Sequence, residues 1–332
     1  MTDYALTPSI VPNQADWTLL DFTGIQQSIM SGAVRTISRG QRWQAHFTWE
    51  NLITDDRHYL SALMALMRGK SNRLWINDPT YRKRGSFPSP ELLANGQFKA
   101  DVVGWSATAA ATLSGSNRVM RLDTGGIAAA GAYQSVNLAA GAAYALRACL
   151  VDGPNSAGLT LGVQMSVNGA PTPNVSLARG LITVAALATS TATGNQFPIS
   201  ISAGGGLAAG QIVFCTYASL RRCALAVNPA AATFGTMLPV DALPVSTRGL
   251  LLAGDRVEIN GEMKSVTFNL DSDAAGAGTL IFEPALRKVV PDNAPIIIGE
   301  PLMKGVMSVD GVQPSRPGVD LFSDFDFTFV EA

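Results

Sequence analysis

Charged residues are scarce in this sequence: Asp, Glu, Lys and Arg make up only 15% of the 332 residues, and the formal net charge is -1. Proteins that bind nucleic acid through its phosphates usually concentrate positive charge, so this balance argues against nucleic-acid binding. The low charge does not indicate disorder, because hydrophobic residues reach 47% and supply ample material for buried cores.

Cysteine is also rare, with Cys149, Cys215 and Cys223 as the only three. None forms a Cys-x-x-Cys pair, so the pattern predicts buried thiols in a protein made in a reducing cytosol. A disulfide between Cys215 and Cys223 stays open on spacing alone.

The residues that catalysis or metal binding would need are few. The only histidines, His46 and His58, lack the further nitrogen or sulfur ligands of a zinc site. A Gly-x-Ser-x-Gly elbow is absent, and no pair of acidic residues stands out as a glycosidase acid and base. We therefore expect neither an enzyme nor a cofactor or metal site.

Long apolar runs are missing as well. A membrane helix needs about 18 or more apolar residues in succession, and no such run occurs, so we expect no membrane partner. Residues 1–10 have neither a basic start nor an apolar centre, so they do not resemble a secretory signal.

Composition divides the chain into three regions. Residues 91–223 hold only 11 charged residues and are rich in Ala, Gly, Ser and Thr, which sets them apart from both flanks. Proline in Phe87-Pro88-Ser89-Pro90 favours a boundary, because it interrupts helices and central strands. We predict a discontinuous domain of residues 1–88 and 225–332, its C-terminal part a candidate small β-barrel, with residues 89–224 inserted.

The first region predicts two strands and a helix. From Gln41 to Trp49, apolar and polar residues alternate, which is typical of a half-buried strand. A helix should follow from Thr54 to about Gly69, with Leu60, Leu63, Met64 and Met67 forming its apolar stripe. Residues 73–76 predict the second strand.

The middle region shows short strands separated by Gly, Asn and Pro turns, which favours an all-β sandwich. The strands are expected at Val119–Leu122, Tyr133–Leu138, Tyr144–Leu150, Leu159–Val167, Phe197–Ile201 and Gln211–Leu220.

The last region predicts further strands at residues 256–259, 263–270, 279–283 and 296–298. A strict two-residue turn at Asn260-Gly261 would place Ile259 beside Glu262, so we expect a bulge or a longer loop there. The segment Phe325–Phe329 alternates sharply and must bury its aromatic face. The aromatic strand of the first region needs a similar partner, and the simplest arrangement joins the first and last regions into one β domain.

Several segments together resemble distal tail and minor tail proteins of long-tailed bacteriophages. They are Gly40–Trp43 with Phe47–Trp49, the helix that follows, Asn72–Pro79, Leu252–Ile259, Asp273–Gly276 and Phe282–Arg287. The resemblance covers residues 17–88 and about 240–332. It implies a β-sandwich domain that assembles as a ring, commonly a hexamer, and joins the tail tube to the hub and receptor-binding parts. Tape measure proteins and tail fibres are further implied neighbours, and the implied location is the virion, after assembly in the host cytoplasm.

The inserted region resembles carbohydrate-binding jelly rolls. Leu93–Phe98 with Gly104-Trp105 is similar to their opening strand, and Tyr133–Leu138 with Gly141 and Tyr144 to a later strand pair. Trp105 and Tyr133 are the candidates for stacking on a sugar ring, with core packing as the alternative for both. The closing strand, residues 213–220, lacks the Asp that helps to hold a structural calcium in such modules, so the presence of that calcium stays open.

Fold class and function follow from these patterns. We expect a mainly β protein: a ring-forming β-sandwich or barrel domain with one short helix, plus an inserted jelly roll. The first hypothesis is a structural subunit of a phage tail tip or baseplate. The alternative is an adhesion module that binds host-surface polysaccharide through the insertion, and an enzyme acting on cell-wall sugars ranks last.

Overall fold

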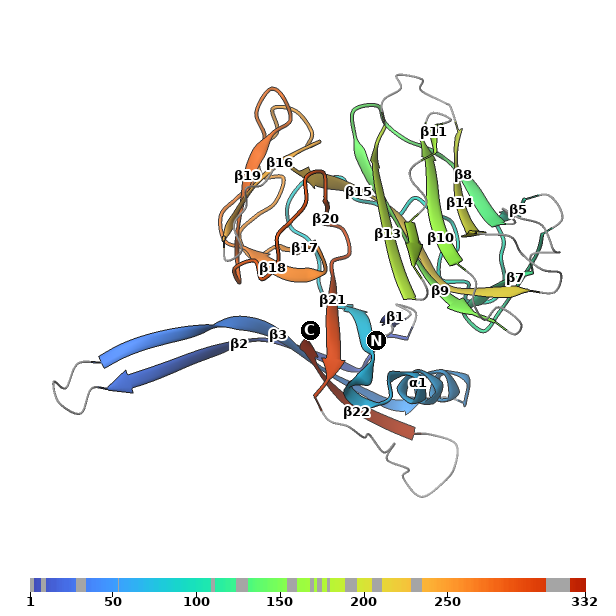
Figure 1. The fold of residues 1–332 in the computed structure, drawn as a ribbon, viewed down its shortest axis with the longest axis horizontal. Helices are drawn as coiled ribbons and strands as arrows, with labels where there is room; N and C mark the ends of the chain where they lie inside the picture. Colours follow the sequence, from blue (N-terminus) through green and yellow to red (C-terminus); the bar gives the residue numbers. More distant parts are fainter. Residues whose placement is uncertain are drawn as a thin grey trace.

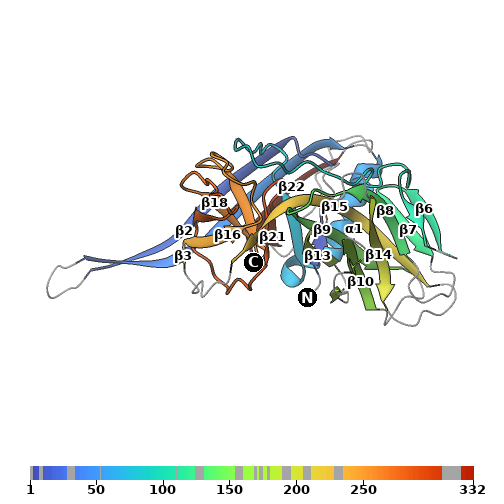
Figure 2. The same ribbon diagram turned by 90° about the horizontal axis from the view of Figure 1, so that it is seen from above.

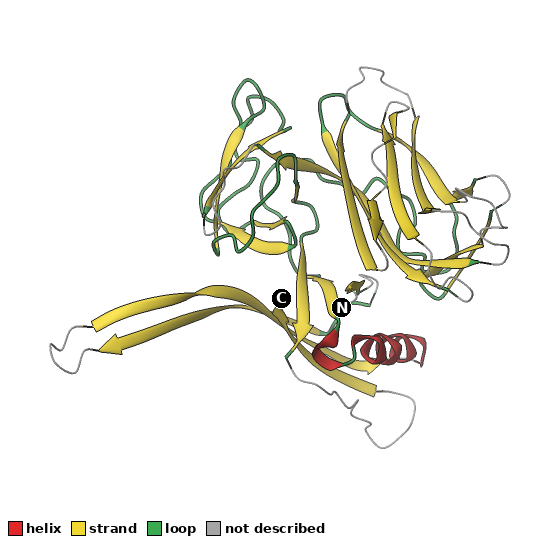
Figure 3. Cartoon of the chain, viewed as in Figure 1, coloured by secondary structure: helices red, strands yellow, loops and turns green. Residues whose placement is uncertain are grey.

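The structure is a computed structural model of the chain. It describes residues 3–6, 10–27, 34–52, 54–108, 111–123, 131–153, 160–167, 170–171, 175–177, 180–188, 196–204, 211–227, 235–308 and 323–332. Within these ranges the chain forms 22 β-strands, one α-helix and one short 3-10 helix. The expectation of a mainly β protein with one short helix is confirmed. The strands form three bodies, here called the base sheet, the sandwich and the barrel (Figures 1 and 3).

The base sheet combines strands from both ends of the chain. Its order is β1 (Asp3–Ala5), β4 (Arg73–Asn77), β21 (Leu302–Met307), β22 (Ser323–Glu331), β3 (Val34–Leu52) and β2 (Gln14–Gln27). The β1–β4 pair is parallel and the other neighbours are antiparallel. Phe325 and Phe327 on β22 pair in register with Trp49 and Phe47 on β3, so the two alternating aromatic segments lie side by side.

Helix α1 (Thr54–Met67) covers part of the aromatic face of the base sheet. Leu60, Leu63 and Met67 are buried and Met64 is half-buried, which confirms the predicted stripe. The helix ends at Met67, two residues before the expected glycine, because Arg68 already adopts a left-handed φ of 49°. The 3-10 helix η1 (Gly69–Ser71) leads from there to β4. Under α1, the rings of Trp49 and Phe327 lie 5.7 Å apart.

The hairpin of β2 and β3 extends beyond the base sheet as a two-stranded arm (Figures 1 and 2). β22 pairs with β3 only from Leu52 to Gln44, whereas β2 stays paired with β3 out to Gln27 and Val34. The sequence predicted a strand only from Gln41 to Trp49, so both the length of β3 and the whole of β2 were missed.

The sandwich consists of two facing antiparallel sheets. One has the order β11 (Ala170–Pro171), β10 (Thr160–Val167), β14 (Gln196–Gly204), β8 (Gly131–Asn137) and β5 (Ser106–Ala107), with β12 (Val175–Leu177) paired to β10. The other contains β13 (Gly180–Leu187), β9 (Ala143–Asp152), β15 (Ile212–Ala226), β7 (Val119–Asp123) and β6 (Thr112–Ser116).

The pairing in the sandwich is nested: β7 pairs with β15, β8 with β14 and β9 with β13. This arrangement, in which early strands pair with late ones around a central turn, is that of a jelly roll. All six strands predicted here are present, and β13 is the longest one that the sequence did not predict. Cys149, Cys215 and Cys223 are buried free thiols, as expected.

The barrel closes on itself through β15. Its further strands are β16 (Met237–Asp241), β17 (Arg256–Ile259), β18 (Glu262–Val266), β19 (Gly278–Glu283) and β20 (Pro295–Ile297). Each strand pairs with the next in the cycle β15-β16-β19-β18-β17-β20-β15. β15 therefore runs unbroken past residue 224, where the expected boundary lay, and belongs to both sandwich and barrel.

The expected bulge or longer loop after β17 is wrong. Ile259 and Glu262 are direct partners, and Asn260 and Gly261 form a two-residue turn with φ values of 49° and 80°. The expectation assumed that a charged Glu262 would avoid buried Ile259. The structure buries Glu262 because the ammonium of Lys264 lies 2.7 Å from its carboxylate.

No helix in the described ranges has both the length and the apolar character needed to cross a membrane.

Candidate functional site

The structure places Trp105 in the core of the sandwich. Its side chain is 8% exposed, its ring centroid lies 5.6 Å from that of Phe98, and its Nε1 donates to the Asn95 carbonyl at 3.4 Å. Core packing therefore accounts for this indole, and a sugar ring could stack on it only if the core opened.

Tyr133 lies on β8 and points away from the core that contains Trp105. Its neighbours on β8, Ala132 and Gln134, are buried, so the alternation of the strand turns the half-buried Tyr133 outward. Tyr133 is in register with Ser106 on β5 and Ser200 on β14. Trp105 and Tyr133 are thus not brought together into one site.

A buried ion pair joins the sandwich to the barrel and the base sheet. The Arg147 guanidinium on β9 donates to the Glu258 carboxylate on β17 at 2.9 Å, and the side chains are 3% and 6% exposed. The same carboxylate accepts the backbone N–H of Leu302 on β21 at 2.9 Å. Burial raises the pKa of Glu258, while Arg147 acts in the opposite direction. One pair of side chains therefore fixes three elements relative to one another.

A second set of contacts locks the barrel onto the base sheet through Arg256. Its guanidinium lies 5.0 Å from the ring centroid of Trp43 and 5.4 Å from that of Trp17, within the range of a cation–π interaction. It also pairs with Asp78. The Tyr81 hydroxyl accepts the backbone N–H of Arg256 at 2.8 Å, and burial raises the pKa of Tyr81 to about 12.

Four charged side chains, three buried and one half-buried, connect the C-terminal strand to the barrel. Besides the Lys264–Glu262 pair, Arg287 lies 3.3 Å from Glu331 on β22, and Glu331 accepts the backbone N–H of Met263 at 2.9 Å. Burial lowers the pKa of Lys264, opposed by Glu262, and raises that of Glu331, opposed by Arg287. Sequence reasoning missed this cluster because each residue lies in a strand of ordinary mixed composition.

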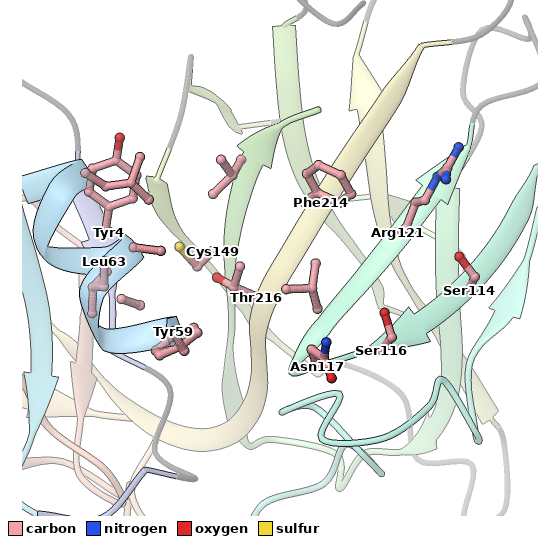
Figure 4. A pocket seen from close by; sticks show the side chains of 15 residues that line it. Tyr4, Tyr59, Leu63, Ser114, Ser116, Asn117, Arg121, Cys149, Phe214 and Thr216 are labelled. Carbon is pink, nitrogen blue, oxygen red and sulfur yellow. The ribbon is translucent and has the colours of Figure 1, made fainter. Parts of the chain in front are cut away.

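A cleft of about 500 Å³ lies where the sandwich faces α1 and β1 (Figure 4). It is lined by Tyr4, Ala5, Tyr59, Ala62, Leu63, Leu66, Ser114, Ser116, Asn117, Val119, Arg121, Cys149, Val151, Phe214 and Thr216. This volume is in the usual range for small-ligand sites. Figure 4 shows Tyr4, Tyr59 and Leu63 on one side of the cleft, and Phe214, Arg121, Ser114 and Ser116 on the other.

An ion pair ties the two walls of the cleft together. Ser116 and Val119 are partners on β6 and β7, so Asn117 and Arg118 form the turn between them, with φ values of 49° and 64°. The Arg118 guanidinium lies 2.8 Å from the Asp56 carboxylate on α1. Positive φ at both central residues is what a two-residue hairpin turn requires. Sequence reasoning missed the cleft because its walls lie far apart in the chain.

The described part of the chain holds no group of three or more His, Cys, Asp or Glu side chains that could bind a metal ion. His46 lies 2.7 Å from Asp326 across β3 and β22, at a partly exposed position. His58 lies on α1 at an exposed position.

No protein-family model matches the chain, and no curated protein matches it. Among solved structures, it is similar to the CBM22-1 xylan-binding domain from Paenibacillus barcinonensis, with 10% identity, a TM-score of 0.34, and coverage of 41% of this chain and 97% of that domain. A family 16 carbohydrate-binding module gives 19% identity and a TM-score of 0.30, covering 39% of this chain and 98% of the module. An arabinose-bound α-L-arabinofuranosidase gives 15% identity and a TM-score of 0.35, over 42% of this chain but only 27% of that enzyme. The jelly-roll description of the sandwich rests on its strand pairing.

Proposed function

We propose that the protein is a structural subunit of a phage tail tip or baseplate, which forms a ring with copies of itself. The ring would join the tail tube to the hub and to receptor-binding components. The proposal includes no catalytic step, and it places the protein in the virion.

The observation that carries this proposal is the arm of β2 and β3. A two-stranded ribbon is only marginally stable by itself in water, and both of its outer edges carry unpaired backbone groups. Beyond Gln44 the described strands give the arm no third strand. A neighbouring copy is the simplest partner, because closed rings of identical subunits repeat one contact around an axis.

The buried ion pairs further support a structural role. Arg147–Glu258 and the cluster around Lys264 hold the three bodies in one fixed arrangement. A subunit that holds a tube and a hub in a fixed relative position needs such rigidity.

The arm can be removed at a defined point. Asp21 and Gln41 are partners, so replacing residues 22–40 by Asn-Gly would close the hairpin with a two-residue turn. A matched control replaces only residues 28–33 by Asn-Gly, which keeps both arm strands up to the paired Gln27 and Val34. Light scattering should give a closed oligomer for wild type and control, and a monomer for the variant without its arm. Equal masses for all three would refute the role of the arm.

A second candidate function is polysaccharide binding by the sandwich, which the outward-facing Tyr133 favours. The full chain is required for the test, because β15 continues into the barrel and an isolated segment 89–224 would cut it. On a glycan array, wild type should bind and Tyr133→Ala should not. Tyr144→Phe, at a buried position of the same body, is the folding control and should bind as wild type does. No binding by wild type would end this candidate.

A further inference from the structure

The cleft between α1 and the sandwich has two chemically different walls. One wall, from β1 and α1, presents Tyr4, Tyr59, Leu63 and Leu66. The other, from β6, β7 and β15, presents the hydroxyl groups of Ser114, Ser116 and Thr216 beside the ring of Phe214. A ligand that fits both walls needs an apolar face and a rim of hydrogen-bonding groups.

The charge of the cleft is close to balanced. Arg121 is the one charged residue among the described residues that line it, and its guanidinium lies 3.6 Å from the Asp123 carboxylate. Asp123 offsets the charge of Arg121, so the cleft has no unpaired charge for an ionic ligand, which suits a neutral one.

We propose that this cleft binds a short neutral oligosaccharide. A sugar ring has an apolar C–H face that can lie against Phe214 or Tyr59, while its hydroxyl groups both donate and accept hydrogen bonds, as Ser114, Ser116 and Thr216 do. The site lies on the sheet that contains β15, not on the sheet that contains Tyr133. It is therefore distinct from the second candidate above, and it does not depend on ring formation.

The Arg118–Asp56 pair gives the site its shape. It joins the β6–β7 turn to α1 next to Asn117, so the two walls are held at a fixed spacing before a ligand arrives. Because the cleft is already formed, less free energy is lost to ordering its walls when a ligand binds.

The proposal is tested with the full chain by titration calorimetry. The probes are cellotetraose, xylotetraose and maltotetraose as neutral sugars, tetragalacturonate as a charged sugar of equal length, and decanoate as an apolar ligand without hydroxyl groups. At least one neutral tetrasaccharide should bind with a dissociation constant of about 1 mM or lower. Tetragalacturonate and decanoate should bind at least tenfold more weakly.

Two variants locate the binding site. Phe214→Ala should weaken binding roughly tenfold or more, while Phe268→Ala, which removes a 65% exposed ring from the barrel, should leave it unchanged. Leu66→Lys places a long charged side chain in the cleft from a 43% exposed helix position, so the fold should tolerate it and binding should be lost. Ala65→Lys, at an exposed neighbouring position that does not line the cleft, is its control.

Four outcomes would overturn the proposal: no binding of any neutral probe at millimolar concentration, tighter binding of tetragalacturonate or decanoate, unchanged binding in Leu66→Lys, or loss of binding in Tyr133→Ala alone. The last result would place the sugar on the other sheet. None of these results bears on the oligomer masses that test the ring.

Discussion

At the scale of single residues, this protein depends on charges that are removed from water. Arg147, Glu258, Lys264 and Glu331 are all buried, and each has an opposite charge within hydrogen-bonding or ion-pair distance. Burying an ion is costly, and the loss of one partner leaves that cost uncompensated. These pairs therefore make the arrangement of the three bodies specific, and they are sensitive to substitution.

Arg147→Ala should lower the free energy of unfolding by about 3–5 kcal/mol, because it leaves the Glu258 carboxylate buried without its cation. Urea unfolding followed by fluorescence measures the change. Arg121→Ala is the control, since that side chain is 49% exposed and its ion pair should contribute less than about 1 kcal/mol. Similar losses in the two variants would mean that the Arg147–Glu258 pair does not hold the bodies together.

The raised pKa of Tyr81 predicts that the stability of the protein depends on pH above 10. Its pKa is raised from 10.0 to about 12 in the folded protein, so between these values the unfolded chain has lost a proton that the folded chain keeps. Stability from this group therefore falls as the pH rises from 10 to 12. Tyr81→Phe should be less stable than wild type at neutral pH, because it loses the hydrogen bond to Arg256. The gap between the two proteins should narrow from pH 10 upward, and a constant gap would contradict the assignment.

At the scale of elements, the sequence predicted best those strands that have one apolar and one polar face. The segments 41–49 and 325–329 alternate and pair with each other, and α1 shows its stripe at helical spacing. β2 was missed although a strand signal was present, because its half-buried Ala15, Trp17 and Leu19 alternate with exposed polar residues. β13 was missed because Gly180–Leu187 is almost continuously apolar, a pattern that does not distinguish strand from helix.

The candidate site was less accessible to sequence reasoning than the fold. Trp105 and Tyr133 were identified by residue type, but type alone does not tell which face of a strand a ring occupies. The cleft combines residues from β1, α1, β6, β7, β9 and β15, and no local pattern connects them. The bulge expected at Asn260-Gly261 was wrong because Lys264, two residues beyond Glu262, neutralises its charge.

The tight turn at Asn260-Gly261 also sets how closely the barrel approaches β4. A Cβ added at Gly261 would lie 2.9 Å from the Trp75 ring, and φ there is 80°. Gly261→Ala should therefore combine a strained backbone with a clash, and should cost roughly 2–4 kcal/mol. Gly141→Ala is matched, because φ is 72° there and a Cβ would meet nothing within 4 Å. Thermal unfolding of both variants should show the larger loss for Gly261→Ala, and equal losses would exclude the contact with Trp75.

At the scale of the whole molecule, three bodies share strands and buried charges, while one element extends away from all of them. β15 belongs to sandwich and barrel alike, and β21 and β22 bring the end of the chain back to the base sheet. The arm is the exception, since past Gln44 its described strands pair only with each other (Figure 1). A ribbon with no third strand among the described residues is the feature on which the proposed ring assembly rests.

Single-particle imaging of the purified full chain tests this account most directly. Closed rings should be visible, with the β2–β3 arm of each copy resting on the adjacent copy. Particles that remain single under all concentrations, or rings whose arms point into solvent without touching a neighbour, would contradict it.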